Sequence, residues 1–166
     1  MDRDDDILTA KILVVDDDKY IVNLLNVQLK LAGFRNVLSV TDSRKAISEY
    51  VRFKPDLLIL DLVMPNIDGF MILQSLSELK SQAHNILILT SLNDPEIRQK
   101  AMRMGAKDFL NKPFQREQAI PRIRRLLAAR RRLGYLSRCN RELEDISRRM
   151  NEELDNYRKP GKQKTP

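Results

Sequence analysis

The sequence predicts an α/β fold in which parallel β-strands alternate with helices. Two observations support this prediction. Short apolar runs that suit buried strands recur through the first 130 residues, and each is followed by a longer segment with apolar residues at helical spacing. Right-handed crossovers between parallel strands place helices on both faces of a sheet. With 166 residues and 42% apolar content, the chain suits one domain with an appendage.

The predicted strands and helices can be justified in order. The first strand, "KILVV", ends in four apolar residues, and apolar residues then recur at helical spacing from Ile21 until Gly33 ends the helix. The same unit repeats along the chain. The predicted strands are 11–15, 36–40, 56–60, 85–89 and 107–110, and the predicted helices are about 21–31, 42–53, 69–80, 95–104 and a last one after Phe114.

The strand order follows from the turn after the first strand. Because this turn is not rich in glycine, a flavodoxin-like, doubly wound sheet of order 2-1-3-4-5 is favoured over a dinucleotide-binding sheet. In such folds, ligands bind beyond the carboxyl ends of the strands.

Four of the predicted strands end in polar groups that fit one another chemically. Asp16 and Asp17 follow the first strand, Asp61 the third, Thr90 the fourth and Lys112 the fifth. Carboxylates brought together need a cation or a proton, and oxygen ligands suit Mg²⁺. A lysine ammonium and a threonine hydroxyl can meet phosphoryl oxygens. The set therefore predicts a site for phosphoryl transfer.

Single residues of this kind also have an ordinary structural interpretation. An aspartate such as Asp18 commonly caps the helix after a strand, and Asp68 in "MPNIDG" suits the same role. A single lysine is commonly a solvated surface charge. The joint pattern, with different groups at the ends of different strands, favours the functional interpretation.

Four motifs carry a resemblance to a known family: the acidic run in "VVDDD", then "DLLILDLVMPNIDGF", "ILILTS" and "GAKDFLNKPF". From residue 10 to about residue 130, the chain resembles the receiver domain of two-component response regulators. The resemblance implies that Asp61 accepts a phosphoryl group from a histidine kinase or a phosphotransfer protein. It also implies no enzymatic activity beyond the domain's own phosphorylation and dephosphorylation.

The resemblance further implies a metal site. Asp17, Asp61 and the backbone carbonyl of Val63 would bind Mg²⁺, with Mn²⁺ as a substitute, and Asp16 would act largely through water. Val63 offers no polar side chain to orient an attacking water, so we expect a long-lived phosphoryl state.

The resemblance implies a switch as well. Thr90 and Lys112 would contact the phosphoryl group, and the Lys112–Pro113 bond would be cis. Thr90 and Phe109 would shift together on phosphorylation and change protein contacts. Because Phe109 has no hydroxyl, its part in the switch would be packing alone.

Two other functions compete with a phosphorylated switch. A Mg²⁺-dependent phosphohydrolase would use Asp16 as nucleophile and Asp18 as acid, but it would need a second acidic cluster after the lysine. None follows Lys112 at a strand end, and Asp61 would have no role. The third hypothesis is a scaffold that binds metal without being phosphorylated, against which the complete site argues.

The excess positive charge lies in the C-terminal part of the chain. Residues 1–114 hold 15 Lys/Arg and 16 Asp/Glu, whereas residues 115–166 hold 15 and 7. We divide the chain into an acidic N-terminal extension, a receiver domain, a long helix and a tail that is disordered by composition. Their predicted ranges are 1–9, 10–125, 126–157 and 158–166.

Heptads can be written from Leu126 onward, which predicts a parallel two-stranded coiled coil and a homodimer. The residues expected at its seam include Leu133, Leu136, Asn140, Leu143, Met150 and Leu154. A single amphipathic helix that folds back on the domain is the alternative, and a helix of this type also suits a connection to an output domain. A solvated helix face explains the arginines of 122–132 better than a nucleic-acid surface, since no aromatic residue lies among them.

The sequence also bears on location. The longest apolar runs are far too short to span a bilayer, and the N-terminus is acidic where a secretory signal would be basic and then apolar. The single cysteine, Cys139, fits a reducing compartment. We therefore expect a cytoplasmic protein without a membrane partner.

Overall fold

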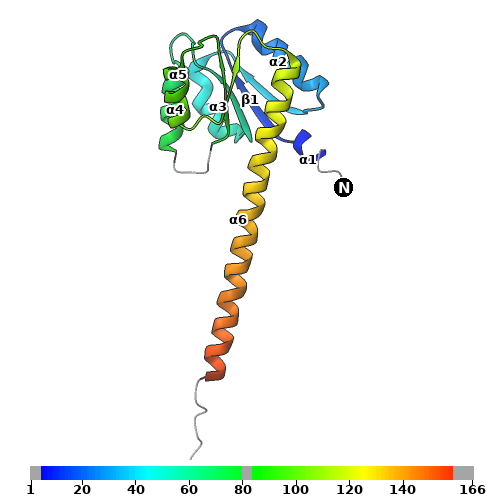
Figure 1. Ribbon diagram of the computed structural model, residues 1–166, viewed down its shortest axis with the longest axis vertical. Coiled ribbons are helices and arrows are strands. Elements are labelled where there is room, and N and C mark those ends of the chain that lie inside the picture. Colours follow the sequence, from blue (N-terminus) through cyan, green and yellow to red (C-terminus); the bar gives the residue numbers. More distant parts are fainter. Residues whose placement is uncertain (1–4, 80–83, 159–166) are drawn as a thin grey trace, which may run out of the picture. The chain divides into compact units, whose positions relative to one another are not determined.

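The computed structural model describes residues 5–79 and 84–158, with the side chains of residues 7–79 and 84–154. Within them lie a five-stranded sheet and the helices around it (Figure 1). The elements are α1 (Asp5–Leu8), β1 (Lys11–Val15), α2 (Lys19–Leu31), β2 (Asn36–Val40), a 3₁₀ turn (Ser43–Lys45), α3 (Ala46–Phe53), β3 (Leu57–Asp61), α4 (Gly69–Glu78), β4 (Ile86–Thr90), α5 (Pro95–Arg103), β5 (Asp108–Asn111) and α6 (Arg116–Arg158).

The sheet is parallel throughout and has the order β2-β1-β3-β4-β5, which confirms the predicted fold class and strand order. β1 and β3 are neighbours, with Val14 opposite Ile59, and β3 in turn pairs with β4. The chain segments that follow β1, β3 and β4 therefore leave the sheet at the same edge.

Alternate strand residues face two separate apolar layers. Ile12 and Val14 pack with side chains of α2 and α6 on one face, whereas Leu13 and Val15 pack with α3, α4 and α5 on the other. Figure 1 shows these helices around the sheet. Because both faces are covered, the central strands β1, β3 and β4 need apolar residues at nearly every position, which is why they contain continuous apolar runs.

The observed elements differ from the predicted ones in a few places. β3 begins at Leu57 and ends at Asp61, one residue later than predicted, so Asp61 is itself the last strand residue. The short helix α1 was not predicted, and its Leu8 packs beside Gly33, where an added Cβ would lie 3.2 Å from a Leu8 methyl carbon. The predictions for residues 1–4, 80 and 159–166 lie outside the described residues.

The helix α6 belongs to two units of the chain. Contacts divide the chain into residues 1–130 and 131–166. Leu126 and Leu127 are buried in the core of the first unit. Leu126, the first residue of the predicted heptads, therefore cannot contribute to a coiled-coil seam. From Leu133 onward, large apolar side chains of α6 are exposed. We call six of them the α6 stripe: Leu133, Leu136, Leu143, Ile146, Met150 and Leu154.

The arginines of α6 in the first unit have partners within the domain. Arg116 and Arg124 donate hydrogen bonds to the carbonyl oxygens of Leu31 and Ala32, at the C-terminal end of α2. Cations are favourable at that end of a helix because its last carbonyls lack partners. Further ion pairs join Arg122 and Arg125 to Asp108, and Arg130 to Asp56. These contacts give the arginines a structural role.

Within the described part of the chain, no helix combines the length and the apolar character that crossing a membrane would require.

Candidate functional site

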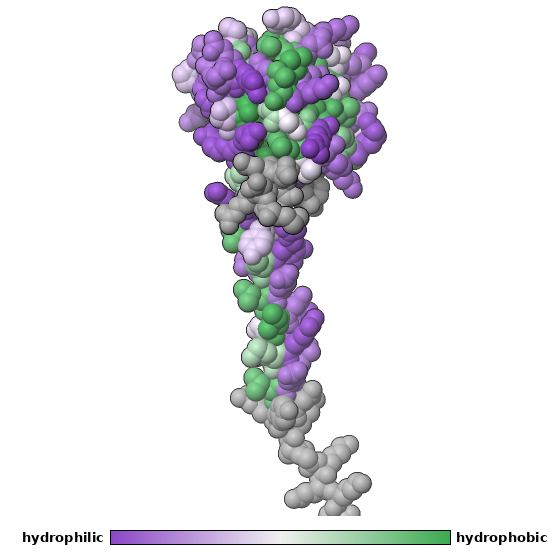
Figure 2. All heavy atoms as spheres, turned by 90° about the vertical axis from the view of Figure 1, so that its right-hand side faces the viewer, coloured by the Kyte–Doolittle hydropathy of each residue, from purple (hydrophilic) through white to green (hydrophobic). Residues whose placement is uncertain are grey.

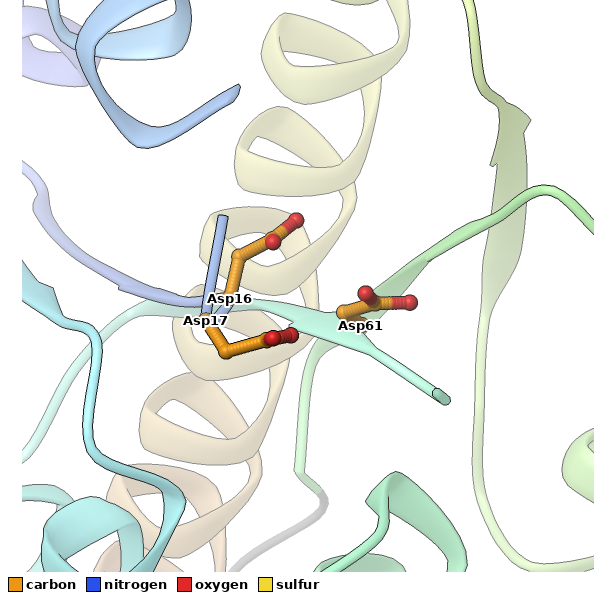
Figure 3. A group of neighbouring side chains, drawn as sticks. All are labelled: Asp16, Asp17 and Asp61. Atoms are coloured by element: carbon orange, nitrogen blue, oxygen red, sulfur yellow. The ribbon is translucent and has the colours of Figure 1, made fainter. Parts of the chain in front are cut away.

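Three carboxylates meet at the carboxyl edge of the sheet. Asp16 and Asp17 directly follow β1, and Asp61 ends the neighbouring β3 (Figure 3). One carboxylate oxygen from each residue lies within 4.8 Å of the other two. Asp16 is fully buried and Asp61 is 5% exposed, while Asp17 lies at the surface. The sheet order thus assembles an acidic cluster with one buried wall and one open side.

Lys112 reaches this cluster from β5. Its Nζ atom lies 2.7 Å from Oδ2 of Asp16 and 2.7 Å from Oδ2 of Asp61. The lysine side chain is only 15% exposed, so both contacts are largely shielded from water. The bond from Lys112 to Pro113 is cis, as expected. One ammonium group therefore lies between two carboxylates that would otherwise repel each other.

Burial and charge act in opposite directions on the pKa values of these groups. Burial raises the pKa of Asp16 above its ordinary value and outweighs the lowering effect of Lys112. Burial also acts to lower the pKa of Lys112, but the two carboxylates raise it above its ordinary value. The lysine is therefore held in its charged form, and burial makes Asp16 accept a proton more readily than an ordinary aspartate does.

Backbone groups hold the two buried carboxylates in place. Oδ1 of Asp16 accepts a hydrogen bond from the N–H of Asp18 (3.0 Å), and Oδ1 of Asp61 accepts one from the N–H of Val63 (3.1 Å). Val63 itself is 55% exposed beside the site. Each aspartate is thus oriented by the turn that follows its own strand.

The loop from Asp61 to α4 depends on a glycine for a reason that the sequence did not reveal. A glycine in a loop commonly supplies a positive φ, but the positive φ of this loop belongs to Asn66 (φ 69°). Gly69 is instead needed for space, because an added Cβ would lie 2.4 Å from the carbonyl oxygen of Asp61. Asp68 caps α4 as predicted, accepting from the N–H of Met71 at 2.8 Å.

Ser43 is a supporting residue that the sequence did not identify. It is buried, and its hydroxyl donates to the carbonyl oxygen of Pro65 (2.7 Å) while accepting from the N–H of Ile67 (3.2 Å). It thereby fixes the loop that follows Asp61. The only sequence signal is a serine just after the helix-capping Asp42, and nothing in that pattern points to a loop more than twenty residues away.

Thr90 and Phe109 lie near the same edge. Thr90 is the last residue of β4 and is fully buried, and its Oγ1 accepts a hydrogen bond from the N–H of Leu92 (3.0 Å). Its hydroxyl oxygen is thus engaged with its own loop. Phe109 is 9% exposed on β5, with the guanidinium carbon of Arg98 5.3 Å from its ring centroid.

Asp18 does not join the acidic cluster. Its Oδ1 accepts from the N–H of Tyr20 (2.8 Å), so it is the N-cap of α2, as its ordinary interpretation predicted. The clustered aspartates are Asp16, Asp17 and Asp61.

The cluster fits a hard divalent cation. All of the side-chain atoms that the cluster offers to a metal ion are carboxylate oxygens, the ligands that Mg²⁺ prefers. Oδ2 of Asp16 is buried and, among the described residues, has the Lys112 ammonium as its ion-pair partner but no well-aligned hydrogen bond. A cation at the open side would satisfy charge that one lysine leaves unbalanced.

A parallel sheet of order 2-1-3-4-5 with an acidic cluster and a lysine at its carboxyl edge defines a receiver-type signalling domain. The chain belongs to the response regulator receiver domain family, whose model matches residues 12–124.

Several known proteins are similar to this chain. The chemotaxis protein CheY of Bacillus subtilis is 30% identical over 120 residues, which cover 72% of this chain and 99% of that protein. The DNA-binding dual master transcriptional regulator RpaA of Synechocystis sp. is 36% identical over 118 residues, which cover 70% of this chain and 48% of RpaA. The chain thus spans about half the length of RpaA and of the other transcriptional regulators that it matches.

A solved structure also matches. The signal receiver domain of a response regulator from Bermanella marisrubri superposes with a TM-score of 0.65 at 32% identity. The match covers 72% of this chain and 98% of that one.

Proposed function

We propose that the protein is a phosphorylation switch in which Asp61 accepts a phosphoryl group from a histidine kinase or a phosphotransfer protein. The observation that carries the proposal is the position of Lys112, whose ammonium contacts both Asp16 and Asp61. A carboxylate attacks an anionic phosphoryl group only if their mutual repulsion is neutralised. Lys112 provides one of the positive charges needed for this.

The chemical step needs few groups from the protein. A carboxylate oxygen of Asp61 forms a bond to phosphorus as the bond from phosphorus to the donor's imidazole nitrogen breaks. Asp61 can be held for this attack by the N–H of Val63, which donates to its Oδ1. The work of the site is positioning and charge neutralisation, as in other phosphoryl transfers.

Mg²⁺ is the cation that this site suits, and Mn²⁺ would be an adequate substitute. Asp17, Asp61 and the carbonyl oxygen of Val63 would hold it, with Asp16 acting through water. When bound, such an ion neutralises charge on the transferring phosphoryl group. Asp17 is suited to this role because it is exposed, so its carboxylate can bind an ion that arrives from solvent.

Phosphorylation would change the conformation of Thr90 and Phe109. Once the phosphoryl group is present, the Thr90 hydroxyl gains a strong acceptor that competes with its bond to Leu92. Movement of Thr90 would open space for the Phe109 ring, which Arg98 now covers. The switch would therefore change the surface of α5 and β5 by packing.

A homodimer through the α6 stripe is the second part of the proposal. Large apolar side chains that are at least 50% exposed along one side of a helix favour a partner that covers them. A second copy carries a matching stripe, which supports pairing of two chains.

The hydrolase alternative receives no support from the geometry. Its nucleophile, Asp16, is fully buried and paired with Lys112, and its acid, Asp18, caps α2. We propose no activity beyond the domain's own phosphorylation and dephosphorylation. Because the single cysteine fits a reducing compartment, we assign the phosphorylation and dephosphorylation of the protein to the cytoplasm.

The test is to incubate the protein with Mg²⁺ and acetyl phosphate and then measure the intact mass. We expect a gain of one phosphoryl group that is absent in Asp61→Asn and in protein treated with chelator. Asp56→Asn is the matched control, since Asp56 is an aspartate that directly precedes β3, at the end of the strand opposite Asp61. Steady phosphate release that survives Asp61→Asn would indicate the hydrolase, and an unchanged mass would indicate the scaffold.

A further inference from the structure

The α6 stripe runs through a segment whose charge changes sign at one point. Residues 131–141 contain four arginines and no Asp or Glu, whereas residues 142–154 contain five Asp or Glu and two arginines. The net charges are therefore +4 and −3, and the boundary lies between Arg141 and Glu142. Figure 2 shows the hydrophobic side chains along one side of this part of α6 and the hydrophilic side chains beside them.

This charge distribution bears on the orientation of a pair. In a parallel pair of two copies, the basic halves would lie together and so would the acidic halves, which is unfavourable. In an antiparallel pair, each basic half would lie along an acidic half. The sequence alone led us to expect a parallel coiled coil. A heptad pattern does not determine the orientation, however, so the charge distribution has to decide it.

The apolar seam also fits the antiparallel arrangement. If the pair is centred between Arg141 and Glu142, seam residues lie opposite each other as Leu133 and Met150, Leu136 and Ser147, and Asn140 and Leu143. Every layer then contains at least one large apolar side chain. A parallel pair would instead place Asn140 against Asn140 and Ser147 against Ser147, leaving two layers without one.

The flanks of the seam provide an independent observation. Ile146 is 53% exposed and lies one position outside the heptad seam, as does the partly buried Cys139. In the antiparallel register, Ile146 of one chain lies beside Cys139 of the other chain at the flank of the seam, so both side chains become covered. Arg132 and Glu153 face each other in the same way, and two-fold symmetry provides each contact twice. A parallel register would place Arg132 opposite Ser137 and would form no such ion pair.

We propose that the α6 stripe binds the same stripe of a second copy of this chain in antiparallel orientation, with the two-fold axis between Arg141 and Glu142. The inference rests on the homodimer proposed above and adds its geometry. The paired segment, residues 132–153, contains five of the six stripe residues and is about 33 Å long at 1.5 Å per residue. Ion pairs between Arg132 and Glu153 close its two ends.

Cross-linking of single-cysteine proteins tests the orientation. In the full chain carrying Cys139→Ser, Leu133→Cys and Met150→Cys are made as two separate proteins with tags of different mass. Seventeen residues, or about 25 Å of helix, separate the two positions. Mild oxidation of the mixture is expected to join one protein to the other, at least about ten times more than either protein joins to itself.

Charge reversal gives a second measurement on the same dimer. Arg132→Glu and Glu153→Arg are each expected to weaken dimerisation about tenfold, because both symmetric ion pairs become like-charge pairs. The double variant Arg132→Glu/Glu153→Arg should return to within about threefold of the original protein. Arg138→Glu, on the same helix but away from the flanks of the seam, is the matched control.

The outcomes separate the orientation from the dimer itself. Self-cross-linking of each single-cysteine protein would overturn the antiparallel orientation and leave the homodimer standing. A dimer in sedimentation that forms none of these cross-links would also overturn it, because another surface would then be in use. A monomer at all concentrations and phosphorylation states would overturn both the homodimer and its antiparallel orientation. The intact-mass measurement would still test the phosphorylation of Asp61 separately.

Discussion

The Nζ atom of Lys112 lies 2.7 Å from Oδ2 of Asp61, although the two residues are 51 positions apart in the chain. They meet because β3 and β5 both end at the carboxyl edge of one parallel sheet. The same ammonium contacts Asp16 at 2.7 Å. Lys112 therefore places one positive charge against two carboxylates that different strands bring together.

Removal of this lysine charge should destabilise the domain in the absence of divalent cation. We expect Lys112→Met to lose about 2 kcal/mol of unfolding free energy at neutral pH, because Asp16 would remain buried without its ion-pair partner. Urea unfolding in chelator measures the loss, and Mg²⁺ should recover more stability in this variant than in the original protein. Lys107→Met, at an exposed lysine, is the control. Equal stability of the two variants would contradict the role given to Lys112.

Stability should also depend on pH through Asp16. Its pKa is raised by burial, so the folded state binds a proton more readily than the unfolded state. The stability of the original protein relative to Asp16→Asn should therefore rise as pH falls from 7 through the raised pKa. The difference in stability between the two proteins should level off below pH 3.8, which is the ordinary pKa of an aspartate. Unfolding curves in chelator at several pH values measure this, and a difference that falls with decreasing pH would refute the assignment.

Two glycine substitutions should have opposite effects. Gly69→Ala would force a Cβ to within 2.4 Å of the Asp61 carbonyl oxygen, so we expect a loss of about 2 kcal/mol and slower phosphorylation. Gly134→Ala lies in α6 with nothing within 4 Å of the added Cβ and should stabilise that helix by about 1 kcal/mol. Thermal unfolding measures the first effect and helicity by circular dichroism the second. Tolerance of Gly69→Ala would show that the loop can move away from the acceptor.

Val63 should control how long the phosphoryl group persists. The exposed valine beside Asp61 cannot orient a water, so we expect slow hydrolysis in the original protein. Val63→Gln should shorten the phosphoryl half-life about tenfold by supplying a polar side chain there. Intact-mass time courses after removal of acetyl phosphate measure the half-life. Val51→Gln, at a similarly exposed valine on α3, should leave it unchanged. A half-life of a few seconds in the original protein would argue against this account.

Much of this protein could be predicted from local sequence patterns. Apolar runs such as "DLLIL" predict buried strands because both faces of the sheet are covered, and the alternation with helices then limits the possible topologies. The polar residues that end those strands predict the site, since parallel strands deliver their carboxyl ends to one edge. Asp16, Asp61 and Lys112 could therefore be chosen before any distance was known.

Other features depend on contacts between distant parts of the chain. The sequence did not reveal that Gly69 is needed for space, that Ser43 holds the loop after Asp61, or that Leu126 belongs to the core of the first unit. A local pattern describes how a residue fits its own strand or helix, and these three roles are set by other elements.

The sequence by itself determined the alternation of strands and helices and the identity of the charged groups that follow the strands, because hydrophobic periodicity and chain direction are local properties. It also favoured one strand order. Only the tertiary structure decided that one lysine contacts two aspartates, that one of them is fully buried, and which apolar residues of α6 remain exposed. Those outcomes depend on the distances and shielding that packing creates, and such quantities exist only once the elements are assembled.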